Sequence, residues 1–405
     1  MKVIEKKYVL PFLLVTSLFA LWGLANNMTD TLLAAFRKIM QMSDTQTSFI
    51  QMAFYGAYFC LALPAALFIR RYSFKSGVIL GLVLYAAGAV LFLPAAWTES
   101  YAFYLIAIYI LASGCSVLET TANPYIMSMG SPETATRRLN IAQSFNPMGS
   151  ILGILVSKYF ILKDISLYSV SGTYAAVGVV LIAIMVVMLF ARMPEGQDTA
   201  KQDSLSATFK RLLKKRKYSF GVIAQFFYVG AQICVWSFTI RLVMSELDMV
   251  EAQAATIYLI SIIGFCASRF VYTWLMKYVA PRRLLLVGAM LSAVSAIVVV
   301  LAHGWTCVTA LMLVSVFMSL MFPTIYGLAL EGIENPENGG CAGDAKIGAS
   351  GLIMAILGGA LLTPLQGLVS DNSNINMSYI VPAACFIVVL LYSMSVMDTT
   401  QAANN

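Results

Sequence analysis

The sequence predicts an all-α membrane protein with twelve transmembrane helices in two pseudo-symmetric six-helix halves. Hydrophobic residues make up 60% of the 405 positions, and charged residues make up only 11%, against about 25% in soluble domains. Because one spanning helix needs about 20 apolar residues, this content suffices for on the order of twelve spans. The composition therefore excludes a soluble enzyme, a nucleic-acid-binding protein and a disordered chain, and the net charge of +7 falls in short loops rather than on one face.

Each predicted span is an apolar run of helical length, and no run has the alternating pattern of a membrane β-barrel. The runs are separated by short polar segments rich in lysine and arginine. The predicted spans cover about 8–35, 48–69, 76–97, 102–130, 139–162, 171–192, 218–242, 252–276, 283–302, 306–330, 346–370 and 378–397.

The distribution of lysine and arginine predicts the orientation, because cytoplasmic loops carry an excess of these residues. Twenty of the 26 lie on the side of the N-terminus, in 2–7, 70–75, 137–138, 192–217 and 277–283 and at 346. Five lie on the other side, and Arg269 lies within a predicted span. We therefore expect a multi-pass protein of the cell inner membrane with both termini in the cytoplasm.

The longest polar break divides the chain into two predicted bundles. It covers residues 193–217, between a six-helix bundle at 1–192 and a second at 218–405. We interpret its basic stretch, 210–217, as a cytoplasmic loop that follows the charge rule, with a lipid-binding or regulatory patch as the weaker alternative.

The two halves also resemble each other weakly. A shift of 207 or 208 residues places Phe19 on Phe226, Gly23 on Gly230, Gly56 on Gly264, Lys75 on Arg283 and Gly81 on Gly288. Two six-helix halves joined by a cytoplasmic loop are the architecture of the major facilitator transporters, whose substrate site lies near the bilayer midplane between the halves.

Two acidic residues, Asp30 and Glu119, lie well within apolar segments, where an ionisable group is costly and is a functional candidate. Asn27 lies three residues before Asp30, so both share one helix face. A helix-end charge is the alternative for Asp30, and a structural hydrogen bond between helices is the alternative for Glu119.

Amides are the second polar feature of the predicted spans. Gln143 and Asn146 are again three residues apart, near the start of the fifth span. Carboxylates and amides hydrogen-bond hydroxyl groups, while aromatic rings cover the C–H faces of a sugar. The polar faces of the first, fourth and fifth spans therefore favour a site for a neutral polyol.

The two acids also suggest how energy is coupled. An apolar cavity disfavours the charged carboxylate and favours the protonated acid, and each proton moved inward gains about 2.3 kcal/mol per 100 mV of membrane potential. The single histidine, His303, lies at a helix end, so we expect no metal, no cofactor and no enzymatic activity. A passive channel would need a charged or carbonyl-lined pore, and drug efflux would favour an apolar cavity.

Four runs of the sequence identify a family resemblance: LFALWGLANNMTDTLLAAFRKIM, YILASG, LETTANPYI and ETATRRLNIAQSFNP. They closely resemble the bacterial fucose permeases, which are sugar:proton symporters of the major facilitator superfamily. The resemblance implies import of L-fucose with a proton by alternating access. It implies that Asp30 and Glu119 couple protons and that Asn27, Asp30, Gln143 and Asn146 contact the sugar.

One position departs from this pattern. Phe322 precedes Pro323 and Thr324 where fucose permeases carry a tyrosine, and Tyr326 follows one turn later as a possible substitute for the hydroxyl. A related monosaccharide permease of the glucose/galactose type is therefore the alternative. The expected partners are the sugar, protons and the lipid bilayer, with no nucleic acid, and we expect a monomer.

Overall fold

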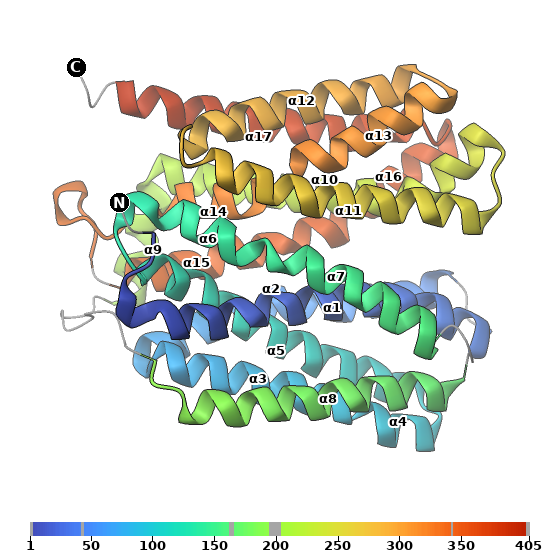
Figure 1. Ribbon diagram of the computed structural model, residues 1–405, viewed down its shortest axis with the longest axis horizontal. Coiled ribbons are helices and arrows are strands. Elements are labelled where there is room, and N and C mark those ends of the chain that lie inside the picture. Colours follow the sequence, from blue (N-terminus) through green and yellow to red (C-terminus); the bar gives the residue numbers. More distant parts are fainter. Residues whose placement is uncertain (1–2, 42–43, 162–165, 194–203, 342, 402–405) are drawn as a thin grey trace. The chain divides into compact units, whose positions relative to one another are not determined.

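The computed structural model describes residues 3–41, 44–161, 166–193, 204–341 and 343–401, and it contains helices and no strand within these ranges (Figure 1). The chain forms two compact units. Unit 1 comprises Met1–Pro132, Met148–Ser204 and Glu334–Met354, and unit 2 comprises Glu133–Pro147, Leu205–Ile333 and Ala355–Asn405. The predicted domain boundaries at 192 and 218 stay a prediction.

In unit 1, α5 lies at the centre and packs against both α2 and α3, while α8 packs against α3 and α15 packs against α2. Its helices are α1 (Val9–Ile39), α2 (Asp44–Arg71), α3 (Phe74–Val90), α4 (Phe92–Thr98), α5 (Tyr101–Ser128), α7 (Phe145–Val156, from Met148 onward), the π-helical turn η3 (Ser157–Ile161), α8 (Leu167–Phe190) and α15 (Asp344–Met354).

In unit 2, α10 contacts α14, α16 and α17, and α12 packs against α13 and α17. Its helices are α6 (Ala135–Gln143), α9 (Leu205–Lys214), α10 (Arg216–Leu247), α11 (Glu251–Leu275), α12 (Pro281–Leu301), α13 (Gly304–Met318), α14 (Met321–Leu330), α16 (Gly358–Asn372) and α17 (Ile380–Gln401).

Eleven helical stretches in the described part of the chain are long and apolar enough to cross a membrane. They correspond to eleven of the twelve predicted spans. The fifth predicted span is also helical, but it is divided at Ser144 into α6 and α7, and α7 continues into η3. Each piece is too short to count as a spanning helix by itself. The eleven long stretches and this divided helix together are consistent with the all-helical, twelve-span fold.

Two segments belong to the unit that is formed mainly by the other half of the sequence: residues 133–147 belong to unit 2, and residues 334–354 belong to unit 1. In unit 2, α6 packs against α14, where the amide of Asn140 donates to Thr324 Oγ1 at 3.3 Å. In unit 1, Lys346 of α15 is buried and places its ammonium 4.8 Å from the ring centre of Phe74. From the sequence, Lys346 was predicted only as a cytoplasmic-side cation at the start of a span, because its local context carries no sign of this aromatic partner.

The weak internal repeat has a structural counterpart at its glycines. A Cβ added to Gly81 in α3 would lie 2.6 Å from Leu118, and one added to Gly288 in α12 would lie 2.9 Å from Leu320. In each half, the glycine therefore lets the third span approach the fourth span closely: α3 approaches α5, and α12 approaches the span that contains α13 and α14. The matched glycines thus occupy equivalent packing positions.

A closer crossing joins α7 to α1 in unit 1. A Cβ on Gly149 would lie 1.7 Å from the carbonyl oxygen of Ala20, and one on Gly153 would lie 2.8 Å from that of Leu24. The spacing of four residues is the small-residue pattern that lets two membrane helices approach. Unit 2 has a similar crossing, since a Cβ on Gly358 would lie 2.0 Å from the carbonyl oxygen of Phe226.

Gly149→Ala is expected to lower the melting temperature by roughly 3–10 °C, because the added methyl meets backbone and α7 must move away from α1. Gly172→Ala in α8 is the matched control, since a Cβ there meets nothing within 4 Å. We expect that control to be neutral or slightly stabilising. A thiol-reactive dye that reports exposure of the buried cysteines on unfolding measures the melting temperature of both variants. Equal melting temperatures would contradict the close crossing.

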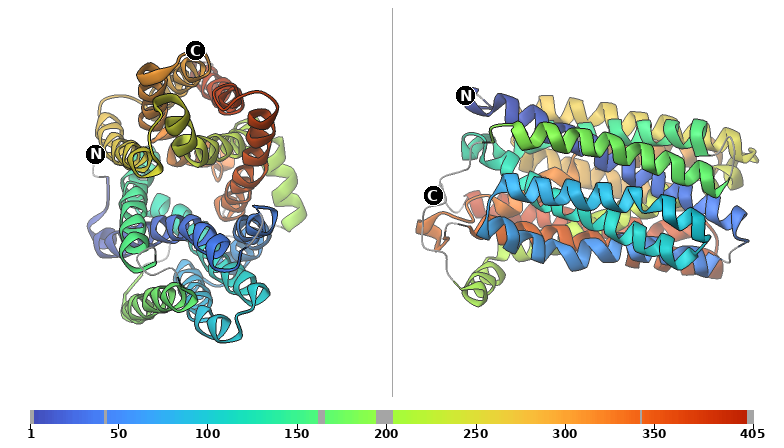
Figure 2. Two further views of the ribbon diagram at one scale, coloured as in Figure 1. Left: turned by 90° about the vertical axis from the view of Figure 1, so that its right-hand side faces the viewer. Right: turned by 90° about the horizontal axis from the view of Figure 1, so that it is seen from below.

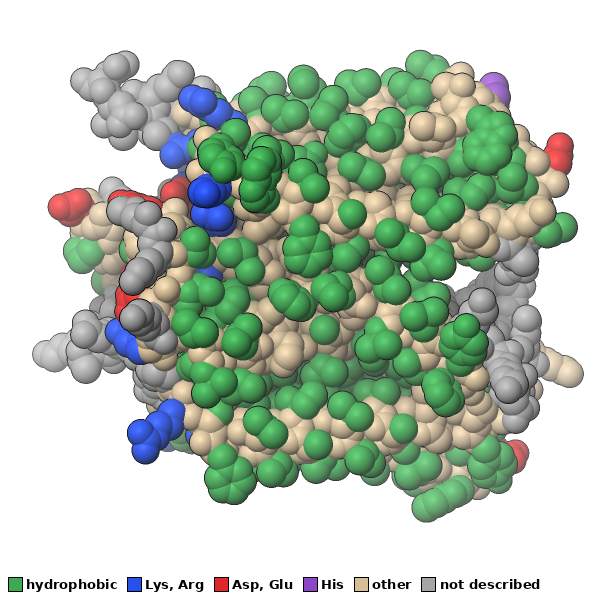
Figure 3. Space-filling view, in the orientation of Figure 1, with side chains coloured by type: hydrophobic (Ala, Val, Ile, Leu, Met, Phe, Trp, Pro, Cys, Tyr) green, Lys and Arg blue, Asp and Glu red, His purple; other side chains and the backbone are tan. Residues whose placement is uncertain are grey.

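The surface fits a lipid environment. On the face shown in Figure 3, hydrophobic side chains cover the length of the helices, while Lys and Arg side chains lie at helix ends. Many large apolar side chains are exposed along the helices, among them Phe190 and Val179 of α8. Contiguous exposed apolar surface of this extent marks an interaction surface, here the bilayer.

Candidate functional site

Glu119 lies in the middle of α5, partly buried between the buried residues Leu118 and Thr120. Two hydrogen bonds, about one turn before Glu119, hold α5 to its neighbouring helices. Trp22 Nε1 of α1 donates to the carbonyl oxygen of Cys115 at 3.0 Å, and Ser116 Oγ donates to the carbonyl oxygen of Tyr58 in α2 at 3.3 Å. Unit 1 therefore holds Glu119 within its helices rather than in a loop.

Asn27 lies on α1, five residues after Trp22, and its amide donates to the carbonyl oxygen of Gly23 at 3.2 Å. Asp30 also lies in α1, but its side chain lies outside the described residues. Because successive spans alternate in direction, α1 and α5 are antiparallel. From the Trp22–Cys115 contact, the backbone positions of Asp30 and Glu119 are then roughly 18 Å apart along the helices.

Gln143 and Asn146 flank the break between α6 and α7 in unit 2. Gln143 is buried at the last position of α6, and Asn146 is partly exposed in the first turn of α7. Pro147 explains part of this geometry, because it has no N–H with which to hydrogen-bond the carbonyl of Gln143, four residues earlier.

Arg269 of α11 supplies the missing donor. It is 3% exposed, and its Nη1 donates to the carbonyl oxygen of Gln143 at 3.0 Å. Its Nε donates at 2.6 Å to the carbonyl oxygen of Ser319, which also lies four residues before a proline, Pro323. One guanidinium thus satisfies two carbonyls that prolines leave without a helical donor.

The same contacts stabilise the charge of Arg269. Gln143 ends α6 and Ser319 caps α13, so both carbonyls lie at the negative ends of helix dipoles. The guanidinium also lies 4.6 Å from the ring centre of Phe265. Arg269 is not among the site residues predicted from the sequence, although Pro147 and Pro323 indicated that two helical carbonyls would need another donor.

Phe322 and Tyr326 lie one turn apart in α14, and both are buried. Their rings are nearly parallel, with centroids 6.5 Å apart, and the ring of Tyr228 in α10 lies 6.5 Å from that of Phe322. The hydroxyl of Tyr228 donates to the carbonyl oxygen of Met318 at 3.2 Å. These aromatic rings therefore lie next to the break between α13 and α14, which Arg269 contacts through the carbonyl oxygen of Ser319.

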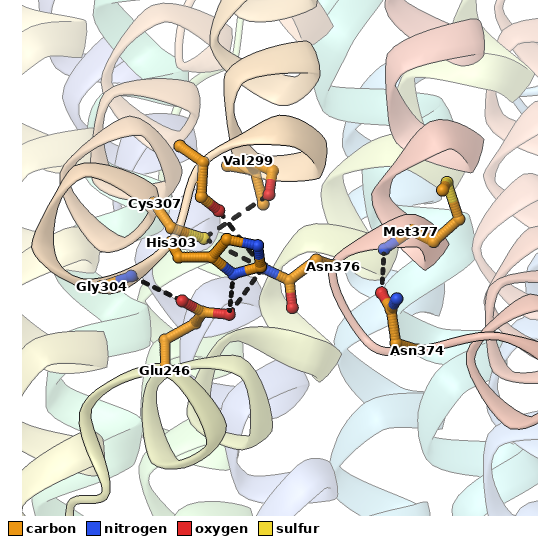
Figure 4. A network of polar contacts seen from close by, with 9 residues as sticks. Glu246, Val299, His303, Gly304, Cys307, Asn374, Asn376 and Met377 are labelled. Carbon is orange, nitrogen blue, oxygen red and sulfur yellow. Dashed lines mark hydrogen bonds and ion pairs between the residues drawn. The ribbon is translucent and has the colours of Figure 1, made fainter.

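A separate polar network surrounds Glu246 at the end of α10 (Figure 4). Its carboxylate, 8% exposed, accepts from Gly304 N at 2.6 Å and Asn376 Nδ2 at 2.7 Å, and lies 3.2 Å from Nδ1 of His303. A carboxylate at the N-terminus of α13 stabilises the helix. Because His303 is 80% exposed, we interpret this network as a structural cap.

The described residues contain no group of three or more His, Cys, Asp or Glu side chains that could hold a metal ion. Unit 1 brings together α1 and α5, which carry Asn27 and Glu119, and unit 2 joins Gln143 to the helix break before Phe322 through Arg269. Each unit thus carries polar side chains on its spanning helices, where such groups are functional candidates.

This chain belongs to the Major Facilitator Superfamily and is a membrane transporter rather than an enzyme. The profile of that superfamily matches residues 13–343.

Among its relatives, the L-fucose-proton symporter of Haemophilus influenzae is 41% identical over 96% of this chain and 97% of its own length. The L-fucose-proton symporter of Escherichia coli is 34% identical over 96% of this chain and 93% of its own. Of solved structures, the transporter FucP in an outward conformation matches with a TM-score of 0.87 and 33% identity, over 96% of this chain and 99% of that one.

Proposed function

We propose that this protein is a proton-coupled symporter that imports L-fucose across the cell inner membrane by alternating access. The observation that carries this proposal is the 41% identity, over nearly the full length of both chains, to an L-fucose-proton symporter. The proposal includes cytoplasmic termini, which the lysine and arginine distribution favours, and a monomeric transporter.

Glu119 and Asp30 have the proton-coupling roles in this proposal. Glu119 supports this role most directly, because it lies partly buried within a spanning helix, where an acidic side chain is rare and functional by default. In the proposed cycle, both acids are protonated when they face the periplasm, sugar binds, the halves rock, and the release of one net proton to the cytoplasm resets the carrier. One proton per sugar at 100 mV supplies about 2.3 kcal/mol, or roughly 50-fold accumulation.

Sugar contacts are assigned to amides, one acid and aromatic rings. Asn27, Asp30, Gln143 and Asn146 supply polar groups for the hydroxyls of L-fucose, and Phe322 and Tyr326 supply the aromatic surface. Arg269 supports this assignment indirectly, because it fixes the backbone at Gln143 and at the break that precedes Phe322.

Counterflow in proteoliposomes tests the function. Vesicles loaded with unlabelled L-fucose are expected to take up radiolabelled L-fucose transiently, with alkalinisation of the external medium when net uptake is driven. Competition by galactose, arabinose and glucose separates the main proposal from the glucose/galactose alternative. Stronger inhibition by glucose or galactose than by L-fucose would favour that alternative, and uptake without proton movement would contradict symport.

Phe322→Tyr tests the position at which this chain departs from the fucose permeases. A hydroxyl that bonds the sugar is worth about 1 kcal/mol, so we expect the KM for L-fucose to fall roughly fivefold with little change in the maximal rate. Phe190→Tyr is the matched control, because that ring is 85% exposed on α8. An unchanged or higher KM in Phe322→Tyr would remove this side chain from the sugar site.

A further inference from the structure

Helix α9 presents an apolar stripe that its own unit leaves uncovered. Leu205, Phe209 and Leu213 are spaced four residues apart and share one face. Leu205 is 39% exposed, Leu213 is 67% exposed and Phe209 is partly exposed. Another face is covered, since Thr208 and Leu212 are buried and α9 contacts α10. Figure 2 shows α9, coloured yellow-green, outside the long helices of unit 2.

The stripe is bordered by positive charge. Residues 205–217 contain six Lys and Arg and no acidic residue. Three of these cations have protein partners. Lys217 Nζ lies 2.5 Å from Glu331 Oε2, Lys215 Nζ donates to the carbonyl oxygen of Ile333 at 2.6 Å, and Arg211 Nη2 donates to Thr208 Oγ1 at 3.5 Å. Lys210 and Lys214, by contrast, are exposed on α9, next to the apolar stripe.

The position of α9 in the chain limits what can cover this stripe. Only Lys215 separates α9 from α10, whose residues Arg216–Leu247 form a membrane span. The hydroxyl of Ser219 also donates to the carbonyl oxygen of Leu213 at 2.9 Å, which fixes the junction. The helix is therefore held at the level where a spanning helix leaves the bilayer, and that level is occupied by lipid headgroups.

We propose that α9 is an interfacial helix that docks on anionic phospholipid headgroups. Leu205, Phe209 and Leu213 insert at the headgroup–acyl boundary, and Lys210 and Lys214 contact the phosphates. A helix with an apolar stripe, a basic border and no acidic residue has the charge complementarity that anionic lipid requires. Lys215 and Lys217 orient the helix by holding the start of α10 to the segment after α14.

Hydrogen exchange of the full-length protein in nanodiscs tests this proposal. Backbone amides of residues 205–214 are expected to exchange roughly tenfold more slowly when phosphatidylglycerol is added to phosphatidylcholine. The difference is expected to disappear in Lys210→Gln/Lys214→Gln and to decrease in high salt. Lys277→Gln/Arg283→Gln is the matched control, because it removes two exposed cations from unit 2 outside α9.

Three outcomes would overturn the proposal. Equal exchange in the two lipids would leave no role for anionic headgroups. Equal loss of protection in the control variant would assign the effect to overall charge. Protection in detergent that increases with protein concentration would identify a second copy of this chain as the partner. The measurement needs no sugar, so its result is independent of the proposed transport activity.

Discussion

Glu119→Gln is expected to exchange L-fucose across the membrane at a rate close to that of the wild type while losing proton-driven accumulation. Glutamine has the shape of the protonated acid but cannot release a proton, so sugar binding and the loaded transition remain while coupling is lost. At 100 mV the steady-state sugar ratio should fall from roughly 50 to about 1. Radiolabelled uptake under an imposed proton gradient, with counterflow in the same vesicles, measures both quantities.

The matched control for this prediction is Glu99→Gln. Glu99 belongs to the same unit, but it is exposed at the end of α4, so we expect accumulation to remain at the wild-type value. Accumulation retained by Glu119→Gln would refute its coupling role. Loss of exchange in a variant that melts normally would instead assign Glu119 to sugar binding.

Arg269→Met should lower both stability and transport. The substitution keeps most of the side-chain volume but removes the donors for the carbonyls of Gln143 and Ser319. An unsatisfied buried carbonyl costs about 1–3 kcal/mol, so the melting temperature is expected to fall by at least roughly 5 °C. The candidate sugar contacts beside these carbonyls should also move. A loss of about 1.4 kcal/mol of sugar-binding free energy would lower uptake about tenfold.

A rescue experiment separates this role from the general loss of a buried cation. Pro147→Ala restores an N–H that can reach the carbonyl of Gln143, so it should recover part of the stability lost in Arg269→Met. Arg241→Met is the control, because Arg241 also lies over an aromatic ring, that of Phe238 at 5.5 Å, yet is exposed. Purely additive effects of the two substitutions would contradict the proline explanation.

The helical spans were predictable because the bilayer leaves the backbone few choices. A spanning segment must satisfy its own hydrogen bonds, so an apolar run of about 20 residues becomes a helix whatever its neighbours are. Glu119 could be identified in the same way, since an acid in such a run is rare enough to be noticed. The division of the fifth span at Ser144 was less accessible, because a proline weakens a membrane helix without always ending it.

Packing partners were not predictable in this way. The sequence predicted Lys346 only as a cation at the cytoplasmic start of a span, and only the folded unit shows it buried against Phe74. It also left Arg269 outside the site, since its partners Ser319 and Gln143 are 50 and 126 residues away. No local pattern encodes which distant carbonyl a guanidinium will reach.

The amino-acid order alone thus determined the membrane class, the positions of the spans and the acids within them, because each depends on transfer of nearby residues from water to lipid. The tertiary structure decided that residues 334–354 join unit 1 and that 133–147 join unit 2. It also decided that Arg269 binds the two carbonyls that prolines leave without a helical donor, and which face of α9 stays uncovered. These features depend on contacts between distant segments, whose free energies exist only once the helices have packed.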